Sequence, residues 1–184
     1  MQSPSASLPR IAFAAWSGSG KTTLLQGVIP ALRARGLRPA MIKHAHHAFD
    51  VDKPGKDSFE LRHAGADQML VASSRRYALM VETPETDDGR VPDLDMLCSR
   101  LDPQRADLIL VEGFKQSDLP KIEVHRPGLS KPPLYHEIDG VIAVATDAHT
   151  LNFDGPLLPV NDPDAVARFI IDYLNIDTPE APDG

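Results

Sequence analysis

A short run of glycine, serine, lysine and threonine near the N-terminus has the residue types that bind phosphate. Residues 11–15 are apolar and predict a short buried strand, and the segment from Trp16 to Gly20 predicts a loop. A helix is expected to begin at Lys21. Glycines let successive backbone N–H groups turn toward one anion, the helix N-terminus adds positive potential, and Lys21 adds a full charge. We therefore expect a phosphate-binding loop, in which Thr22 offers its hydroxyl to Mg²⁺.

One position departs from the usual pattern G-x-x-x-x-G-K-[ST]. Ala15 stands where that pattern has its first glycine. Alanine costs little there if its φ is negative, whereas a positive φ would strain it. An ordinary Gly/Ser turn or a plain helix N-terminus is the alternative interpretation of the segment.

A second candidate group follows a continuously apolar stretch, residues 108–111, which predicts a strand buried on both faces. Asp107 and Glu112 flank it and lie about 16 Å apart in an extended chain, so they cannot both bind one metal ion. Ligands of open α/β sheets bind at the carboxyl ends of the strands. We expect Glu112 to position a Mg²⁺-bound water and Asp107 to be structural. Alternatively, Glu112 caps Gly113 or pairs with Lys115.

Another dense group of ionisable residues follows the predicted strand 37–43. It consists of Lys43, His44, His46, His47, Asp50, Asp52, Lys53, Lys56 and Asp57. Because this segment follows a strand end, we expect it to face the same crevice as the phosphate-binding loop. Asp57 or Ser58 is expected to cap a short helix that ends at Gly65.

The remaining patterns complete an α/β fold. They predict helices over 21–35 and after Asn161 or Asp162, a helix marked by Leu94, Leu97 and Leu101, a hairpin of 69–72 with 78–82, and strands at 141–145 and 157–160. Lys121 to Arg126 alternates with period two, which is consistent with an exposed edge strand. Arg126 could still reach phosphate.

We predict a P-loop NTPase-type three-layer sandwich with a mostly parallel central sheet and a β-hairpin extension. Residues 1–9 would be a loose tail, 10–175 a single nucleotide-binding domain, and 176–184 a disordered acidic tail.

Composition narrows the class of protein further. The 184 residues carry a net charge of -7, yet residues 1–76 hold 11 Lys and Arg against 5 Asp and Glu, and the remainder holds 8 against 21. Positive charge around the loop suits a local polyphosphate site and argues against a general nucleic-acid binder. A single cysteine, no export signal and no apolar run of bilayer length suggest a cytoplasmic protein without a membrane partner.

Four segments together resemble the molybdopterin-guanine dinucleotide biosynthesis protein B (MobB) family. They are Ser17 to Thr23, Lys43 to His47, Asp52 to Ser58, and Leu110 to Lys115, and the similarity covers about residues 11–174. The resemblance implies a P-loop protein that binds GTP with Mg²⁺, hydrolyses it weakly, forms a homodimer and assists the partner enzyme that attaches GMP to molybdopterin. It places the phosphates on Ser17, Gly18, Ser19, Gly20, Lys21, Thr22 and Thr23, and Mg²⁺ at Thr22 and Glu112.

The resemblance leaves the role of residues 44–57 open among three possibilities. Asp50 or Asp52 could orient an attacking water. Lys53 and Lys56 could hold the phosphate of molybdopterin. The histidines His44, His46 and His47 could ligate a metal, although the consecutive pair points in different directions.

Guanine recognition needs a group other than the common Asn-Lys-x-Asp motif, which is absent from the chain. Asp147 follows a predicted strand, and its carboxylate could accept hydrogen bonds from both guanine N–H groups. Asn161 and Asp162 are rival candidates.

Two other functions use the same residues. In a small-molecule kinase, Lys115, Lys121, Arg126 and Lys131 would form a lid over the acceptor. In a GTP-dependent metallochaperone, the histidine-rich segment would carry a metal. No arginine finger or well-placed base is evident near the loop, which favours an accessory protein with slow turnover.

Overall fold

The computed structural model describes residues 7–45, 49–83 and 93–179. The chain forms two compact units, Met1–His44 with Pro92–Gly184, and Ala45–Val91. No helix of the described residues is long and apolar enough to span a membrane.

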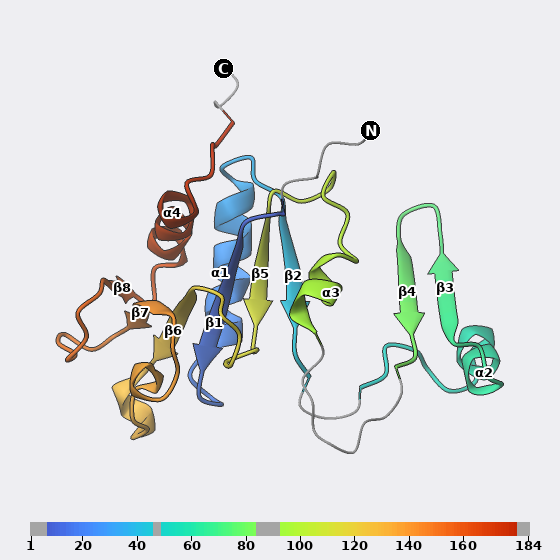
Figure 1. Ribbon diagram of the computed structural model, residues 1–184, viewed down its shortest axis with the longest axis horizontal. Coiled ribbons are helices and arrows are strands. Elements are labelled where there is room, and N and C mark those ends of the chain that lie inside the picture. Colours follow the sequence, from blue (N-terminus) through green and yellow to red (C-terminus); the bar gives the residue numbers. More distant parts are fainter. Residues whose placement is uncertain (1–6, 46–48, 84–92, 180–184) are drawn as a thin grey trace. The chain divides into compact units, whose positions relative to one another are not determined.

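The first unit is built on a sheet of six parallel strands (Figure 1). In spatial order the strands are β2 (Pro39–Lys43), β5 (Leu108–Glu112), β1 (Arg10–Ala15), β6 (Lys121–His125), β7 (Val141–Thr146) and β8 (Leu157–Pro159). Because every strand runs in the same direction, their carboxyl ends lie at one edge of the sheet. The prediction of a mostly parallel central sheet is confirmed.

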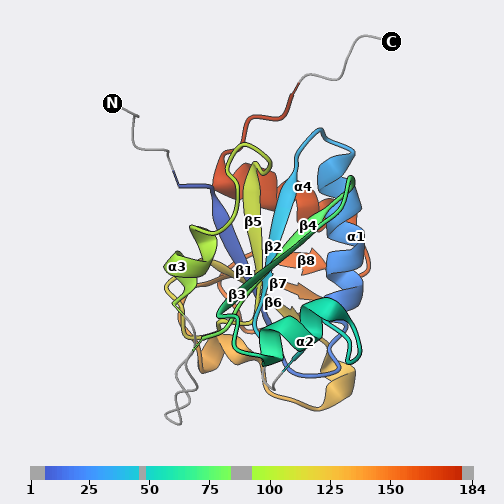
Figure 2. The same ribbon diagram turned by 90° about the vertical axis from the view of Figure 1, so that its right-hand side faces the viewer.

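Helices cover both faces of this sheet. On one face, α1 (Lys21–Arg33) and α4 (Pro163–Leu174) pack on alternate strand residues such as Ile11, Phe13 and Ile122. On the other face, α3 (Leu94–Cys98) packs near Ala12 and Val111. Figure 2 shows α1 and α3 on opposite sides of the strands. The predicted three-layer sandwich is therefore confirmed.

Strand β6 corrects one prediction, because it is a central strand and not an exposed edge. It lies between β1 and β7, and all five of its residues are buried. Ile122 and Val124 belong to the core under α1 and α4. The alternating partners Lys121 and Glu123 are also buried, at 1% and 0% exposure.

Backbone groups satisfy these buried charges. The ammonium of Lys121 donates to the carbonyls of Ser117, Leu119 and Asp139. Burial lowers the pKa of Lys121, and Asp118 and Asp139 offset part of that effect. A lysine enclosed in this way cannot belong to a mobile lid, so this part of the kinase hypothesis is wrong.

The carboxylate of Glu123 accepts hydrogen bonds from two successive amides at the start of the 3-10 helix η2 (Leu134–His136). The distances are 2.7 Å to the Leu134 nitrogen and 2.9 Å to the Tyr135 nitrogen. Hydrogen bonds to a charged group contribute about 1.5–3 kcal/mol each. Glu123 therefore fixes the segment after β6 against the sheet.

The second unit contains α2 (Asp57–His63) and an antiparallel hairpin of β3 (Gln68–Ala72) and β4 (Tyr77–Val81), which confirms the predicted hairpin. Arg62 of α2 binds Asp50 and Glu82 and so ties both ends of the unit to the helix. The expected cap by Asp57 or Ser58 is wrong. Lys56 is the N-cap residue and makes no side-chain cap, while the Ser58 hydroxyl donates to Asp52.

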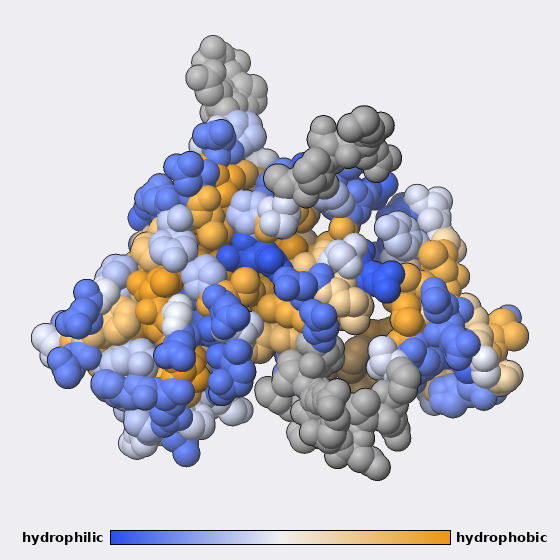
Figure 3. Space-filling view, in the orientation of Figure 1, coloured by the Kyte–Doolittle hydropathy of each residue, from blue (hydrophilic) through white to orange (hydrophobic). Residues whose placement is uncertain are grey.

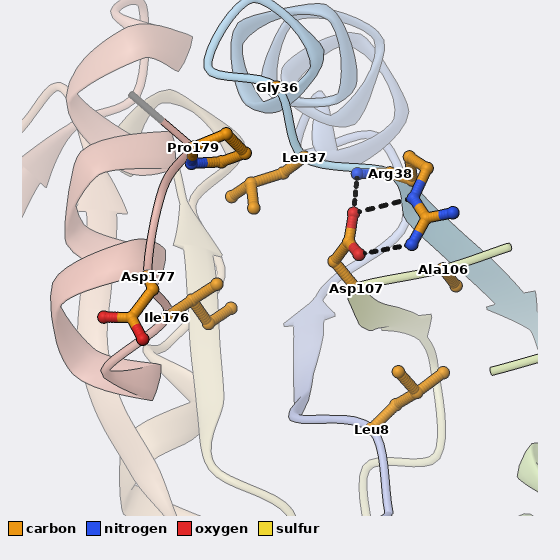
Figure 4. A pocket seen from close by; sticks show the side chains of 9 residues that line it. All are labelled: Leu8, Gly36, Leu37, Arg38, Ala106, Asp107, Ile176, Asp177 and Pro179. Atoms are coloured by element: carbon orange, nitrogen blue, oxygen red, sulfur yellow. Dashed lines mark hydrogen bonds and ion pairs between the residues drawn. The ribbon is translucent and has the colours of Figure 1, made fainter. Parts of the chain in front are cut away.

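A pocket of about 480 Å³ lies near the amino ends of β2 and β5 in the first unit, opposite the phosphate-binding loop (Figure 4). On one side Arg38 donates to both carboxylate oxygens of Asp107, at 2.6 and 3.0 Å. Ile176 and Pro179 of the C-terminal segment face this pair across the pocket. Asp107 thus has the structural role expected from the sequence. The rest of the predicted acidic tail, residues 180–184, lies outside the described residues.

Asp107→Asn is expected to lower the free energy of unfolding at neutral pH. The hydrogen bonds from Arg38 hold the pKa of Asp107 below its ordinary value. A depressed carboxyl pKa contributes stability above the ordinary pKa and loses it as the pH falls through the folded-state value. The stability difference between the wild type and Asp107→Asn should therefore shrink below about pH 4. Urea unfolding at several pH values measures it.

Asp154→Asn is the matched control, because Asp154 is exposed and forms no ion pair among the described residues. A difference for Asp107→Asn that stayed constant across the pH range would contradict this account.

Candidate functional site

The phosphate-binding loop joins the end of β1 to the start of α1. Gly18 and Gly20 have φ values of 82° and 83°, which side chains rarely adopt. Ala15 ends β1 and is not among the described residues with positive φ. The alanine at this position is therefore unstrained, and the departure from the usual glycine pattern costs no backbone energy.

Several amide groups of this loop remain available to a ligand. The Ser19 amide donates to the Trp16 carbonyl at 3.3 Å, and the first helical bond runs from the Leu24 amide to the Gly20 carbonyl. Among the described residues, the amides of positions 20–23 have no acceptor. Ser19 is 2% exposed, and its hydroxyl has no partner in the described part of the chain. Unpaired amides at a helix N-terminus form an anion site.

Glu112 lies between two lysines at the carboxyl edge of the sheet. Its Oε1 is 3.4 Å from the Lys21 ammonium and 3.3 Å from that of Lys43. The strand register explains the second contact, because Lys43 of β2 pairs directly with Glu112 of β5. The alternative in which Glu112 pairs with Lys115 is not found among the described ion pairs. Instead, Glu112 holds Lys21 at the loop.

The chain turns sharply after Glu112. Gly113 has a φ of 92°, and a Cβ at this position would lie 2.9 Å from the Cβ of His44. The glycine is thus required both by the backbone conformation and by the close approach of the segment after β2. This turn sets the end of β5 beside the end of β2.

Two oxygen-bearing side chains near the phosphate-binding loop suit Mg²⁺ as ligands. Thr22 is exposed at the first turn of α1, and Glu112 offers a carboxylate that is partly buried, at 12% side-chain exposure. Mg²⁺ prefers oxygen ligands and commonly uses one or two protein groups together with substrate phosphates and water. A hydroxyl and a carboxylate fit that pattern.

Arg126 follows β6 and lies on the other side of the loop. Its Nε donates to the Ser19 carbonyl at 3.3 Å, one terminal nitrogen donates to Asp147 at 2.6 Å, and the other donates to Asn161 at 2.8 Å. Asp147 follows β7 and Asn161 follows β8, so neighbouring strand ends bring two of the three candidate base readers to one guanidinium. The third, Asp162, accepts from the Ala165 amide at the start of α4. Each nitrogen of the Arg126 guanidinium makes one of its three contacts, and contact of Arg126 with phosphate stays a prediction.

The chain is similar to proteins of one known family. The family model described as molybdopterin guanine dinucleotide synthesis protein B matches residues 10–147. A protein of Escherichia coli strain K12 named molybdopterin-guanine dinucleotide biosynthesis adapter protein is 54% identical over 168 residues, covering 91% of this chain and 94% of that protein. A protein of the same name from Haemophilus influenzae is 44% identical over 169 residues, covering 91% and 90%.

The chain belongs to the MobB family. Its fold agrees with solved structures of that family at lower identity. The crystal structure of Bacillus subtilis MobB has a TM-score of 0.69 at 24% identity and covers 92% of this chain and 99% of that one. A MobB homolog from Bacillus stearothermophilus has a TM-score of 0.66 at 21% identity, covering 90% and 97%.

The residues predicted in the 44–57 segment of this MobB-family chain mostly lie in the second unit. The carboxylate of Asp50 binds Arg62, which lowers the pKa of Asp50. Asp52 accepts from the Lys53 amide and the Ser58 hydroxyl. Lys53 and Lys56 are exposed. These contacts give both carboxylates a structural role in the second unit, and the proposed chemistry of the four residues stays a prediction.

The metal hypothesis rests on histidines that are only partly described. His46 and His47 lie outside the described residues. Among the residues that the structure does describe, no group of three or more His, Cys, Asp or Glu side chains could hold a metal ion.

Trp16 also belongs to the site, although no sequence motif pointed to it. Its indole N–H donates to the Pro132 carbonyl at 2.7 Å, and the ammonium groups of Lys115 and Lys131 lie 5.0 and 5.7 Å from its ring centre. Lys131 was expected only as part of a kinase lid, and Lys115 as part of that lid or as a partner of Glu112. A large aromatic residue inside a loop of small residues is the signal that could have identified this contact.

Proposed function

We propose that this protein is a GTP-binding adapter in molybdenum cofactor biosynthesis. It binds GTP with Mg²⁺ in the cytoplasm and assists a guanylyltransferase that attaches GMP to molybdopterin, and its own hydrolysis of GTP is weak. Membership of a family whose relatives are named molybdopterin-guanine dinucleotide biosynthesis adapter proteins supports this role.

The observation that carries the proposal is the position of Lys21. Its ammonium is held 3.4 Å from Glu112 at the start of α1, beside amides that have no acceptor among the described residues. When a nucleotide binds, Lys21 and these amides contact its phosphates. Mg²⁺ at Thr22 and Glu112 would neutralise phosphate charge.

Guanine selectivity is assigned to Asp147, with Asn161 beside it. Arg126 fixes both side chains, at 2.6 and 2.8 Å, and also contacts the loop carbonyl of Ser19. A carboxylate held in this way can accept hydrogen bonds from the guanine N–H groups, which adenine does not offer in that arrangement. Arg126 then acts as a positioning residue that links the base site to the phosphate site.

Weak hydrolysis is consistent with the contacts that Asp50 and Asp52, the two candidate catalytic carboxylates, make within the protein. Asp50 is bound to Arg62, and Asp52 is bound to Ser58 and to the Lys53 amide, so neither carboxylate is free of internal partners. If either one orients the attacking water, it must exchange those contacts. Glu112, the carboxylate beside Lys21, is itself paired with two lysines, so turnover is expected to stay slow.

The hairpin of the second unit supports the expected homodimer. Residues directly opposite in an antiparallel pair share a face. One face carries the exposed apolar side chains of Leu70, Tyr77, Leu79 and Val81. Figure 3 shows apolar surface among polar atoms on this unit. An isolated two-stranded hairpin is marginally stable, and the hairpin of a second copy would cover this face.

The central test compares the wild type with Lys21→Ala. Calorimetric titration with GTP and Mg²⁺ is expected to show binding by the wild type and a loss of about tenfold or more in the variant, because a charge-assisted contact contributes about 1.5–3 kcal/mol. The candidate transferase and molybdopterin are then added, and dinucleotide formation is measured. Rapid GTP turnover without the partner, or phosphorylation of a small metabolite, would favour an enzyme over an adapter.

Asp147→Asn is expected to remove the preference for GTP over ATP. The amide presents one donor and one acceptor where guanine needs two acceptors, so GTP affinity should fall about tenfold while ATP affinity changes little. Competition titrations with both nucleotides measure the ratio. Asp154→Asn is the control, and an unchanged ratio in Asp147→Asn would reject this residue as the base reader.

Leu79→Glu is expected to weaken the dimer by at least about tenfold, because burying a leucine side chain contributes about 1.5–3 kcal/mol. Sedimentation equilibrium across protein concentrations measures the change. Ser74→Glu introduces the same charge at the exposed hairpin turn and should leave the dimer intact. Equal effects of the two substitutions would place the dimer surface elsewhere.

A further inference from the structure

The segment after β6 forms a wall beside the phosphate-binding loop. The Trp16 indole is tied to the Pro132 carbonyl at 2.7 Å, and the Leu129 side chain would lie 3.9 Å from a Cβ placed at Gly18. The 3-10 helix η1 (Pro127–Leu129) and the start of η2 belong to this wall, which Glu123 fixes through the Leu134 and Tyr135 amides. The wall is therefore anchored to the loop at one end and to the sheet at the other.

Two ammonium groups, one from the segment after β5 and one from the segment after β6, lie near the Trp16 ring. Lys115 comes from the turn after β5 and Lys131 from the wall after β6, and their nitrogens lie 5.0 and 5.7 Å from the indole centre. Neither lysine forms an ion pair within the described part of the chain, whereas Lys21 and Lys43 bind Glu112. Cation–π contacts at partly exposed sites are weak.

The surroundings of Lys115 carry an uncompensated positive charge. Lys115 is half-buried, and its pKa is lowered first by burial and then by repulsion from Lys21, while Glu137 and Glu123 raise it in part. The ammonium groups of Lys115 and Lys21 are therefore neighbours of like charge. A partly buried charge without a close partner is unfavourable unless a ligand supplies the opposite charge.

We propose that Lys115 and Lys131, placed beside Trp16, form a second phosphate subsite next to the phosphate-binding loop. This subsite takes a terminal phosphate group with two negative charges, beyond the α- and β-phosphates that the loop itself binds. Such a group comes either from the γ-phosphate of the nucleotide or from a phosphate monoester on the second substrate. The inference deepens the proposed function and rests on nucleotide binding at the loop.

The position of the subsite relative to the base readers supports this choice. Arg126, Asp147 and Asn161 follow β6, β7 and β8 and lie on one side of β1 in the sheet, whereas Lys115 follows β5 on the other side. Lys131 follows β6 in the chain and approaches the same Trp16 ring from the wall. A nucleotide whose base lies toward β7 and β8 directs the end of its phosphate chain toward β5. Lys115 is then beyond the phosphates, where a terminal or acceptor phosphate would lie.

Trp16 provides a direct measurement, because it is the single tryptophan of the chain. The full-length wild type is saturated with GDP and Mg²⁺ and titrated with inorganic phosphate, while tryptophan emission and heat are recorded. Binding that draws the ammonium groups from the indole is expected to change the emission. In the double variant Lys115→Gln with Lys131→Gln, phosphate affinity should fall about tenfold or more, and GDP affinity should change less than about twofold.

The matched control is the double variant Arg100→Gln with Arg105→Gln, which removes the same charge from exposed positions. Phosphate binding that is equal in both double variants, or absent from the GDP-loaded wild type, would overturn the subsite. If the wild type fails to bind GDP, the proposed function fails, and the phosphate titration is repeated on nucleotide-free Lys21→Ala with and without the two lysine substitutions. If the two lysine substitutions abolish phosphate binding by Lys21→Ala, the subsite is supported, and if they leave phosphate binding unchanged, the subsite is rejected.

A second arm distinguishes the two sources of phosphate. The wild type and the lysine double variant are titrated with a non-hydrolysable GTP analogue and with GDP. If the subsite binds the γ-phosphate, the preference for the analogue over GDP falls in the double variant, and inorganic phosphate no longer binds beside the analogue. If it binds the second substrate, phosphate still binds beside the analogue in the wild type and is lost only in the double variant.

Discussion

One carboxylate, Glu112, joins three separate segments of the chain at the carboxyl edge of the sheet. It contacts Lys21 from the start of α1 and Lys43 from the end of β2, at 3.4 and 3.3 Å. Removing the carboxylate charge of Glu112 would leave the ammonium groups of Lys21 and Lys43 facing each other without a counter-charge. Glu112 therefore both orients Lys21 and holds β2 in register with β5. The site and the sheet edge depend on the same interaction.

Arg126 has a corresponding place on the other side of the loop. Its three contacts connect the Ser19 carbonyl with Asp147 and Asn161, so the loop is bordered by one acidic and one basic bridge. Both bridges use residues at or just after the carboxyl ends of parallel strands, β2 and β5 for the acidic bridge and β6, β7 and β8 for the basic one. A parallel sheet brings such residues together from distant parts of the sequence, at the edge where open α/β sheets bind their ligands.

The sequence predicted most of the fold because buried parallel strands and amphipathic helices leave strong patterns, as in residues 108–111 and along α4. It failed at β6, and the reason is physical. Lys121 and Glu123 alternate with aliphatic residues, which is the pattern of a half-exposed strand, yet carbonyls and amides from the loops before and after the strand satisfy both charges inside the protein. Those partners lie 2 to 18 positions away and have no sequence signature of their own.

The residues of the candidate site were predicted from the loop motif and, for Asp147 and Asn161, from their positions after strands. Lys21, Thr22 and Glu112 follow from the loop pattern and the strand end, and Ala15 proved harmless because its backbone does not need glycine. The ion-pair partners of Glu112 were not predictable. A pair with Lys115 was the alternative considered from the sequence, but Glu112 instead contacts Lys21 and Lys43.

The ion pairs of Glu112 determine the net charge of the candidate site. Because Glu112 is taken by two other lysines, Lys115 faces Trp16 and repels Lys21, so the site contains more positive charge than its own carboxylates neutralise. Such an excess of positive charge is the electrostatic environment that a polyphosphate site needs, which agrees with the role proposed for this site.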